Sequence, residues 1–164
     1  RKESSAASDV YKRQAMMRSI LTVLVAFLIS TSVQAEDVTS NDDAALGGLA
    51  FKKQCVACHV VVDSSGKKLA GRNGRSGPNL HNVAGAVAGK VDGYRYGKSI
   101  VAAGAKNGLL WTEENFVAYV QDPKGFLRLF LGDKKARAKM TYKVRKERDA
   151  RHIYTYLLRL SDSQ

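Results

Sequence analysis

The sequence predicts an all-α domain with unusually long loops. Apolar residues recur at helical spacing in several segments, and no segment shows a convincing alternation of apolar and polar residues of the kind typical of a half-buried strand. Residues 59–91 are rich in glycine and turn-forming residues. A compact domain rarely contains so long an irregular stretch unless something other than secondary structure organises it. We therefore expect a large group to be buried beside this stretch.

The first helix is predicted from Ala44 to about Ala57. Asp42 and Asp43 lie where an N-cap and an acidic first turn belong. Apolar residues that include Leu46 and Phe51 follow at helical spacing. The polar residues before Asp43 are expected to form a frayed start.

Three further helices are predicted after the glycine-rich stretch. A short one covers Ser99–Ala105. The next begins at Thr112, whose hydroxyl can cap it, and ends at Asp122-Pro123. The last covers about Lys146–Leu160, where one stripe is apolar. Residues 124–145 are expected to be a basic loop.

The first part of the chain predicts export. From Met16 the sequence has one arginine, an apolar run and then Val33-Gln34-Ala35, which is the pattern of a secretory signal. The strongly apolar run is shorter than the about 20 residues of a membrane-spanning helix. We expect cleavage after Ala35 and a periplasmic product, with an uncleaved membrane anchor as the alternative. Residues 9–14 resemble a translated sequencing adapter, so the predicted organisation is a non-native leader (1–15), a signal peptide (16–35) and one domain (36–164).

Composition limits the classes of partner and scaffold. The chain has 27 Lys and Arg against 15 Asp and Glu, a net charge of +12, which favours an acidic partner. The basic residues are spread along the domain without a nucleic-acid-binding motif, so we expect no nucleic-acid partner. Two cysteines are too few for a disulfide framework.

The motif that indicates the chemistry of the protein is Cys55-Val56-Ala57-Cys58-His59. Residues at i, i+3 and i+4 project from one helical face, so both thiols can reach the edge of a haem while the imidazole reaches its iron. The pattern is the signature of c-type haem attachment. A zinc ribbon would need a second ligand pair, which the sequence lacks. A thioredoxin-like pair would need a βαβ context, and a plain disulfide would leave His59 unexplained.

The second axial ligand is predicted to be Met140. It is the methionine of the predicted domain and lies in a polar, basic segment. A thioether raises the reduction potential and fills the sixth position. Filling of the core is the alternative role for a methionine. His81 is a weaker candidate ligand, and His152 is expected at the surface.

With these residues in place, the sequence resembles class I cytochromes c, in particular the bacterial cytochrome c2 group. The resemblance covers residues 43–160 and implies the cytochrome c fold, one haem c attached through Cys55 and Cys58, and an electron carrier rather than an enzyme. Its anchors appear in family order: Gly47 and Phe51, Cys55-Val56-Ala57-Cys58-His59, Gly77-Pro78-Asn79-Leu80, Gly93-Tyr94-Arg95-Tyr96, Trp111-Thr112-Glu113, Tyr119, Asp122-Pro123-Lys124, Lys139-Met140-Thr141-Tyr142, Ile153 and Tyr156-Leu157.

The resemblance also implies roles for individual residues. The carbonyl of Pro78 would accept the Nδ1 proton of His59. Tyr119 would hydrogen-bond near the Met140 sulfur, and Tyr96 and Trp111 would bind the buried propionate. Phe51 and Tyr156 would pack the first helix against the last. For each of these aromatic residues, simple core packing is the alternative. Many relatives have an arginine at the position of Ala86, and Lys90 is one candidate replacement for its charge.

The implied partners are membrane redox complexes that a monomer meets briefly. The donor would be the cytochrome bc complex, and the acceptor a photosynthetic reaction centre, a terminal oxidase or both. Basic side chains around the haem edge would dock by charge. A peroxidase or gas sensor would require an open sixth position, and a tethered carrier would require a retained anchor. The predicted docking residues are Lys52, Lys53, Lys124, Lys139 and Lys143.

Overall fold

A computed structural model of the chain describes residues 35–162, with the side chains of residues 41–161. The chain divides into two units, Arg1–Thr39 and Ser40–Gln164, and the predicted domain of residues 36–164 lies in the second except for its first four residues. The predicted leader and signal peptide lie outside the described residues, apart from Ala35. Within residues 35–162, none of the helices is long and apolar enough to cross a membrane.

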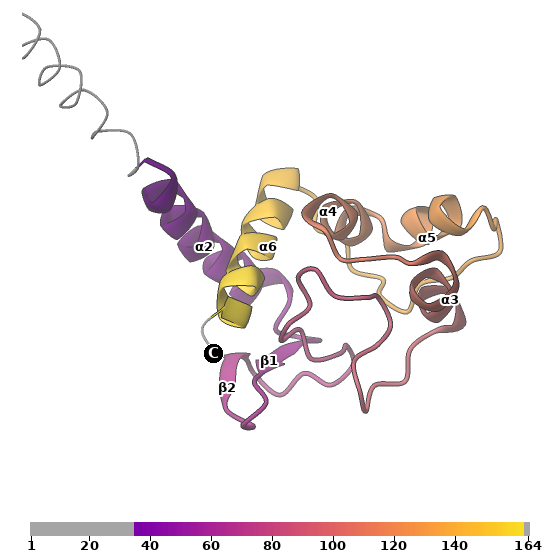
Figure 1. Ribbon diagram of the computed structural model, residues 1–164, viewed down its shortest axis with the longest axis horizontal. Helices are drawn as coiled ribbons and strands as arrows, with labels where there is room; N and C mark the ends of the chain where they lie inside the picture. Colours follow the sequence, from indigo (N-terminus) through magenta and orange to yellow (C-terminus); the bar gives the residue numbers. More distant parts are fainter. Residues whose placement is uncertain (1–34, 163–164) are drawn as a thin grey trace, which may run out of the picture. The chain divides into compact units, whose positions relative to one another are not determined.

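The described residues are rich in helix, as predicted (Figure 1). The elements in chain order are α2 (Ala35–Gln54), β1 (Val60–Val62), β2 (Lys68–Gly71), α3 (Lys98–Asn107), α4 (Glu113–Gln121), α5 (Pro123–Leu131) and α6 (Glu147–Asp162).

Helix α2 differs from its predicted bounds at both ends. It already includes Ala35, so the frayed start was wrong, and Asp43 pairs with α6 instead of capping α2. Its last helical residue is Gln54, after which the chain tightens into turns. Of the predicted apolar stripe, Phe51 is 1% exposed and lies in the core, whereas Leu46 is 48% exposed.

The glycine-rich stretch contains a small sheet that the sequence analysis missed. Strands β1 and β2 are antiparallel, with Val60 opposite Gly71 and Val61 opposite Ala70. Gly66 turns the chain between them with a φ of 84°, a conformation that favours glycine. At 3 and 4 residues these strands are too short to show an alternating pattern.

The predicted end of α4 is also the start of another helix. Thr112 caps α4 as predicted, because its Oγ1 accepts a hydrogen bond from the Asn115 amide at 3.3 Å. Pro123 then occupies the first turn of α5, a position where its missing amide costs nothing. The expectation of a continuous loop over residues 124–145 was therefore wrong. Helix α3 matches its predicted segment and extends slightly beyond it at both ends. Helix α6 begins one residue after its predicted start and ends two residues after its predicted end.

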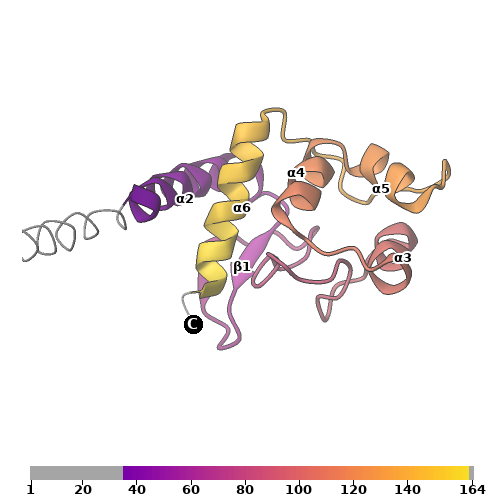
Figure 2. The ribbon, with the colours of Figure 1, turned by 45° about the horizontal axis from the view of Figure 1, so that its top comes forward.

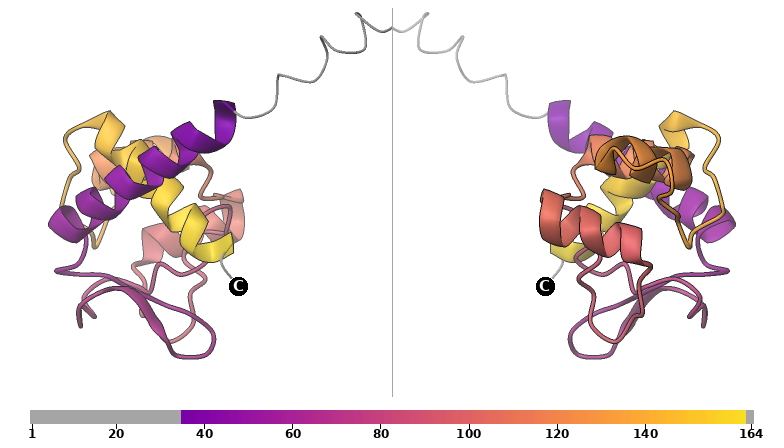
Figure 3. Two further views of the ribbon diagram at one scale, coloured as in Figure 1. Left: turned by 90° about the vertical axis from the view of Figure 1, so that its left-hand side faces the viewer. Right: turned by 90° about the vertical axis from the view of Figure 1, so that its right-hand side faces the viewer.

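Helices α2 and α6 cross each other (Figures 2 and 3), and Gly47 of α2 lies at the contact. A Cβ atom on Gly47 would overlap the backbone carbonyl of His152, so only a glycine allows this approach. Nearby, the rings of Phe51 and Tyr156 pack with centroids 5.6 Å apart, as the resemblance implied. His152 is not at the surface: its side chain is 15% exposed, and Nε2 lies 3.2 Å from Oδ1 of Asp43.

Two apolar clusters form the core of the second unit. One joins α2, α4 and α6 around Phe51, Ile153 and Leu157. The other joins α3 and α5 around Ile100 and Leu127. Trp111 and Tyr119 pack against both clusters. The functional site lies where these two clusters meet.

Candidate functional site

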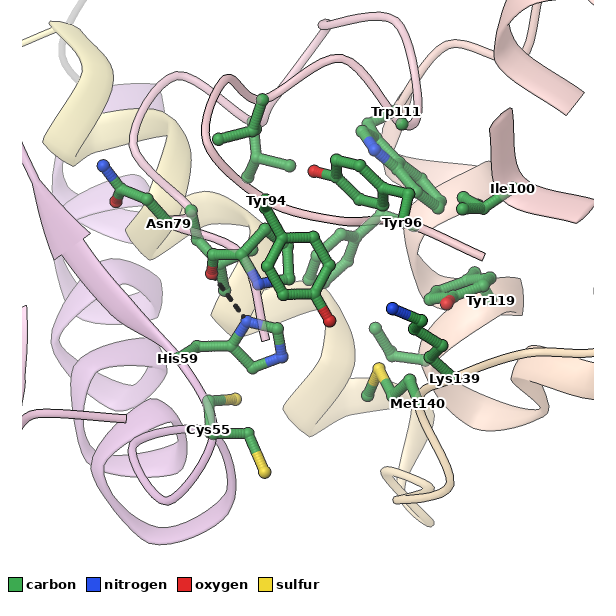
Figure 4. A pocket seen from close by; sticks show the side chains of 18 of the residues that line it. Cys55, His59, Asn79, Tyr94, Tyr96, Ile100, Trp111, Tyr119, Lys139 and Met140 are labelled. Atoms are coloured by element: carbon green, nitrogen blue, oxygen red, sulfur yellow. Dashed lines mark hydrogen bonds between the residues drawn. The ribbon is translucent and has the colours of Figure 1, made fainter. Parts of the chain in front are cut away.

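A large cavity lies between the two core clusters. Its volume is about 1080 Å³, and its lining is mostly apolar. Ordinary small-molecule sites measure roughly 300–1,000 Å³, so this cavity suits a large apolar group. His59 lies on one side of it and Met140 on the other (Figure 4).

The Cys-x-x-Cys-His segment forms one wall as a tight turn after α2. The amides of Cys58 and His59 both donate to the carbonyl of Cys55, at 3.1 and 3.0 Å. Helix-like spacing is thus kept beyond Gln54, which brings both thiols and the imidazole to the cavity. Burial, with the nearby Cys58 as a lesser cause, raises the pKa of the Cys55 thiol to about 12.

The orientation of His59 fits a metal ligand. Its Nδ1 lies 2.9 Å from the carbonyl oxygen of Pro78, as the resemblance implied. A carbonyl can only accept, so Nδ1 carries the proton and Nε2 keeps a lone pair for a metal. Burial lowers the pKa of His59, although the hydrogen bond to Pro78 opposes this shift. A Cβ atom on Gly77 would overlap the imidazole ring, so glycine is needed for this close approach.

Met140 lies in an irregular segment between α5 and α6 and is partly buried against the α2–α4–α6 cluster. Three of its near neighbours in sequence have polar partners. The ammonium of Lys139 donates to the carbonyl of Arg95 and lies 5.5 Å from the Tyr94 ring centroid. The side chains of Tyr142 and Lys143 also bond across to other elements.

The three aromatic residues assigned to the haem all line the cavity. Trp111 and Tyr119 meet edge to face with centroids 4.9 Å apart. Burial raises the pKa of Tyr119 to about 12 and also raises the pKa of Tyr96. Both hydroxyls are therefore protonated at neutral pH and can donate hydrogen bonds.

The five predicted docking lysines are all exposed, but only some of them line the cavity. Lys53 and Lys139 line the cavity, whereas Lys52, Lys124 and Lys143 do not. Lys143 is held by Asp122, with 2.8 Å between Nζ and Oδ1. This bond is the main reason that the pKa of the Asp122 carboxyl lies below its usual range.

The structure adds residues that the sequence analysis had not given a role. Arg137 lines the cavity together with Ala86 and Lys90, which the sequence analysis had already considered. Asn79 binds β1 within the glycine-rich stretch: its Oδ1 accepts from the Val62 amide at 2.9 Å, and its Nδ2 donates to the Val62 carbonyl at 2.7 Å. The signal for Asn79 was its place in the anchor Gly77-Pro78-Asn79-Leu80, whereas nothing in the sequence marks Arg137.

These features together define a c-type cytochrome. The cavity is large and apolar, two thiols and an oriented imidazole lie on one wall, and a thioether lies on the opposite wall. Such a set of groups fits a covalently attached haem.

Comparisons with known proteins identify the family. Cytochrome c2 of Rhodovulum adriaticum is 58% identical over 123 residues, which are 75% of this chain and 96% of the relative. Cytochrome c2 of Cereibacter sphaeroides is 53% identical over 116 residues, or 70% of this chain and 92% of the relative. The crystal structure of cytochrome c2 from Rhodobacter sphaeroides matches with a TM-score of 0.69 and 50% identity, covering 71% of this chain and 94% of that one. No protein-family model matches the chain.

The chain belongs to the bacterial cytochrome c2 family. The predicted class I cytochrome c fold is confirmed. The protein is an electron carrier and not an enzyme, and its haem c is bonded covalently through Cys55 and Cys58.

Proposed function

We propose that the protein is a periplasmic shuttle that takes single electrons from the cytochrome bc complex and delivers them to a photosynthetic reaction centre, a terminal oxidase or both. The observation that supports this proposal best is the pairing of His59 and Met140 across one apolar cavity whose lining includes basic side chains. The bound haem supplies the one-electron chemistry. The polypeptide fixes the ligands, excludes water and presents charge to the partners.

His59 and Met140 are proposed as the two axial ligands. The hydrogen bond from Nδ1 of His59 to the Pro78 carbonyl fixes the ring and increases its basicity. A thioether at Met140 favours the reduced metal and closes the site to exogenous ligands. Because neither ligand has to leave when an electron arrives, the surrounding protein reorganises little.

The haem propionates are proposed to lie near Tyr96 and Trp111. Both side chains line the cavity and carry a polar hydrogen that can be donated to a carboxylate. Tyr119 is proposed to donate toward the Met140 sulfur. Ala86 supplies no charge where many relatives have arginine, and Lys90 and Arg137 are the cavity-lining cations proposed to replace it.

Reconstitution tests the proposed pathway. Purified holoprotein is mixed with quinol and a bacterial cytochrome bc complex, and reduction is followed in the visible bands. Reaction centres or oxidase are then added, and reoxidation is followed in the same bands. Reduction without reoxidation by either acceptor would overturn the proposed delivery step, and a failure of reduction would overturn the proposed donor.

Docking through the lysines makes electron transfer sensitive to salt. Lys53→Gln and Lys139→Gln are each expected to lower the second-order rate with an acidic partner about two- to fivefold at low ionic strength, because both side chains line the cavity. All rates should fall as salt is added. Stopped-flow mixing over a salt series measures this.

Lys106→Gln is the matched control, because Lys106 is exposed on α3 and does not line the cavity. A flat salt profile, or equal losses in the control, would contradict the proposed docking surface.

Export is expected to remove the signal peptide. When the full chain is produced with a haem-maturation system, the periplasmic fraction should contain a haem protein that begins at Glu36, because the segment before it has the pattern of a cleavage site. Intact mass spectrometry measures this. A mass that includes residues 16–35, together with membrane association, would instead support the tethered form.

A further inference from the structure

Three polar side chains form a hydrogen-bonded chain that runs from the irregular segment between α5 and α6, here called the Met140 segment, to α6. The middle member of this chain is Gln54, the residue before Cys55. The hydroxyl of Tyr142 donates to Oε1 of Gln54 at 3.3 Å. Nε2 of Gln54 in turn donates to Oδ2 of Asp149 at 3.2 Å. These residues come from the Met140 segment, from the end of α2 and from α6.

The chemistry of the three side chains fixes which group donates and which accepts in each hydrogen bond. A carboxylate can only accept, so the Gln54 amide must point its NH₂ group toward Asp149. Its carbonyl oxygen is then left to face the Tyr142 hydroxyl, which is the observed arrangement. Asp149 therefore orients Gln54, and Gln54 presents an acceptor to Tyr142.

The position of these hydrogen bonds allows them to hold two walls of the cavity together. Gln54 directly precedes Cys55 and lies five residues before His59, and Tyr142 lies two residues after Met140. Gln54, Tyr142 and both predicted ligands line the same cavity. The Tyr142–Gln54 hydrogen bond thus connects the two walls that bear the predicted ligands, independently of the haem. The Tyr142 side chain is 47% exposed, so the bond lies at the rim of the cavity.

We propose that Tyr142, Gln54 and Asp149 form a latch that keeps the Met140 segment closed against the His59 wall. Tyr142 and Gln54 are positioning residues for Met140, and the inference rests on the proposed ligation by that residue. When the latch is broken, Met140 leaves the iron more often, and an external ligand gains access to the vacated position.

Competition with imidazole measures this opening. Imidazole can bind the ferric iron only while Met140 is away, so its apparent affinity is proportional to the open fraction. Tyr142→Phe removes one hydroxyl and is expected to raise imidazole affinity about two- to tenfold, the range for loss of a single hydrogen bond. Gln54→Leu should raise it by at least as much. In the double variant the effect of Tyr142→Phe should vanish, because its acceptor is already gone.

Tyr154→Phe is the matched control. It also removes one tyrosine hydroxyl from an interelement hydrogen bond, which Tyr154 donates to the Trp111 carbonyl at 3.1 Å. Its imidazole affinity should equal that of the unaltered protein. Guanidinium unfolding of all variants separates local opening from a general loss of stability.

The outcomes separate the latch from the ligation on which it rests. If the unaltered protein lacks the red methionine-to-iron band, the proposed ligation fails. If the band is present but Tyr142→Phe leaves imidazole affinity unchanged, the latch is wrong and the ligation stands. Equal gains in Tyr142→Phe and in the control, or fully additive effects in the double variant, would also overturn the latch.

Discussion

Met140→Ala is expected to abolish the red methionine-to-iron absorption band and to let carbon monoxide bind the reduced protein. The substitution removes the thioether that faces His59 across the cavity, so the sixth position becomes open. Loss of a soft axial ligand should also lower the midpoint potential by on the order of 0.1–0.3 V, because axial ligands set the reduction potential of a haem over a wide range. Visible spectra with and without carbon monoxide, and a redox titration, measure these effects.

Val87→Ala is the matched control for this substitution. Val87 also lines the cavity but has no ligand atom, so its truncation should keep the band and exclude carbon monoxide. If Met140→Ala keeps a low-spin spectrum with an unchanged potential, another residue is the ligand. His81, which lines the cavity as well, would then be the first to replace.

Gly47→Ala is expected to destabilise the folded protein by about 3 kcal/mol, because the added methyl group overlaps the backbone of α6. The clash cannot be relieved by a side-chain rotation, since the carbonyl of His152 belongs to the main chain. The two helices must move apart, which also loosens the contact of Phe51 with Tyr156. Guanidinium unfolding of the holoprotein, followed in its visible bands, measures the change in the free energy of unfolding.

The next residue of α2 supplies a control of the same chemistry. A Cβ atom on Gly48 would lie 3.2 Å from Cε2 of Tyr156, at the movable end of a side chain. Gly48→Ala also gains about 1 kcal/mol of helix propensity, which offsets the cost of this contact. Its net effect on the free energy of unfolding should therefore be close to zero. Equal losses in the two variants would show that the crossing does not depend on Gly47.

Helix α5 shows why part of the fold escaped prediction. Phe126, Leu127 and Phe130 have helical spacing, but the segment has only 9 residues. A lysine and a glycine precede Phe126, and an arginine interrupts the apolar run after Leu127. Pro123 was interpreted only as the end of α4, although proline also suits a helix start. Strands β1 and β2 were missed because pairing partners, rather than local pattern, create such short strands.

The sequence by itself determined the features that depend on near neighbours along the chain. The spacing of Cys55, Cys58 and His59 identifies covalent haem attachment, and the Thr112 cap and the apolar stripe of the last helix locate α4 and α6. In each case the physical cause acts within about one turn of helix.

Only the tertiary structure decided which distant residues meet. It shows that Lys53 and Lys139 reach the cavity while Lys52 and Lys124 do not, and that His152 pairs with Asp43 inside a helix crossing. Tyr142 and Gln54 are separated by 88 positions yet share a hydrogen bond. Such contacts follow from how packed helices cross and loops close, which no local pattern in the sequence encodes.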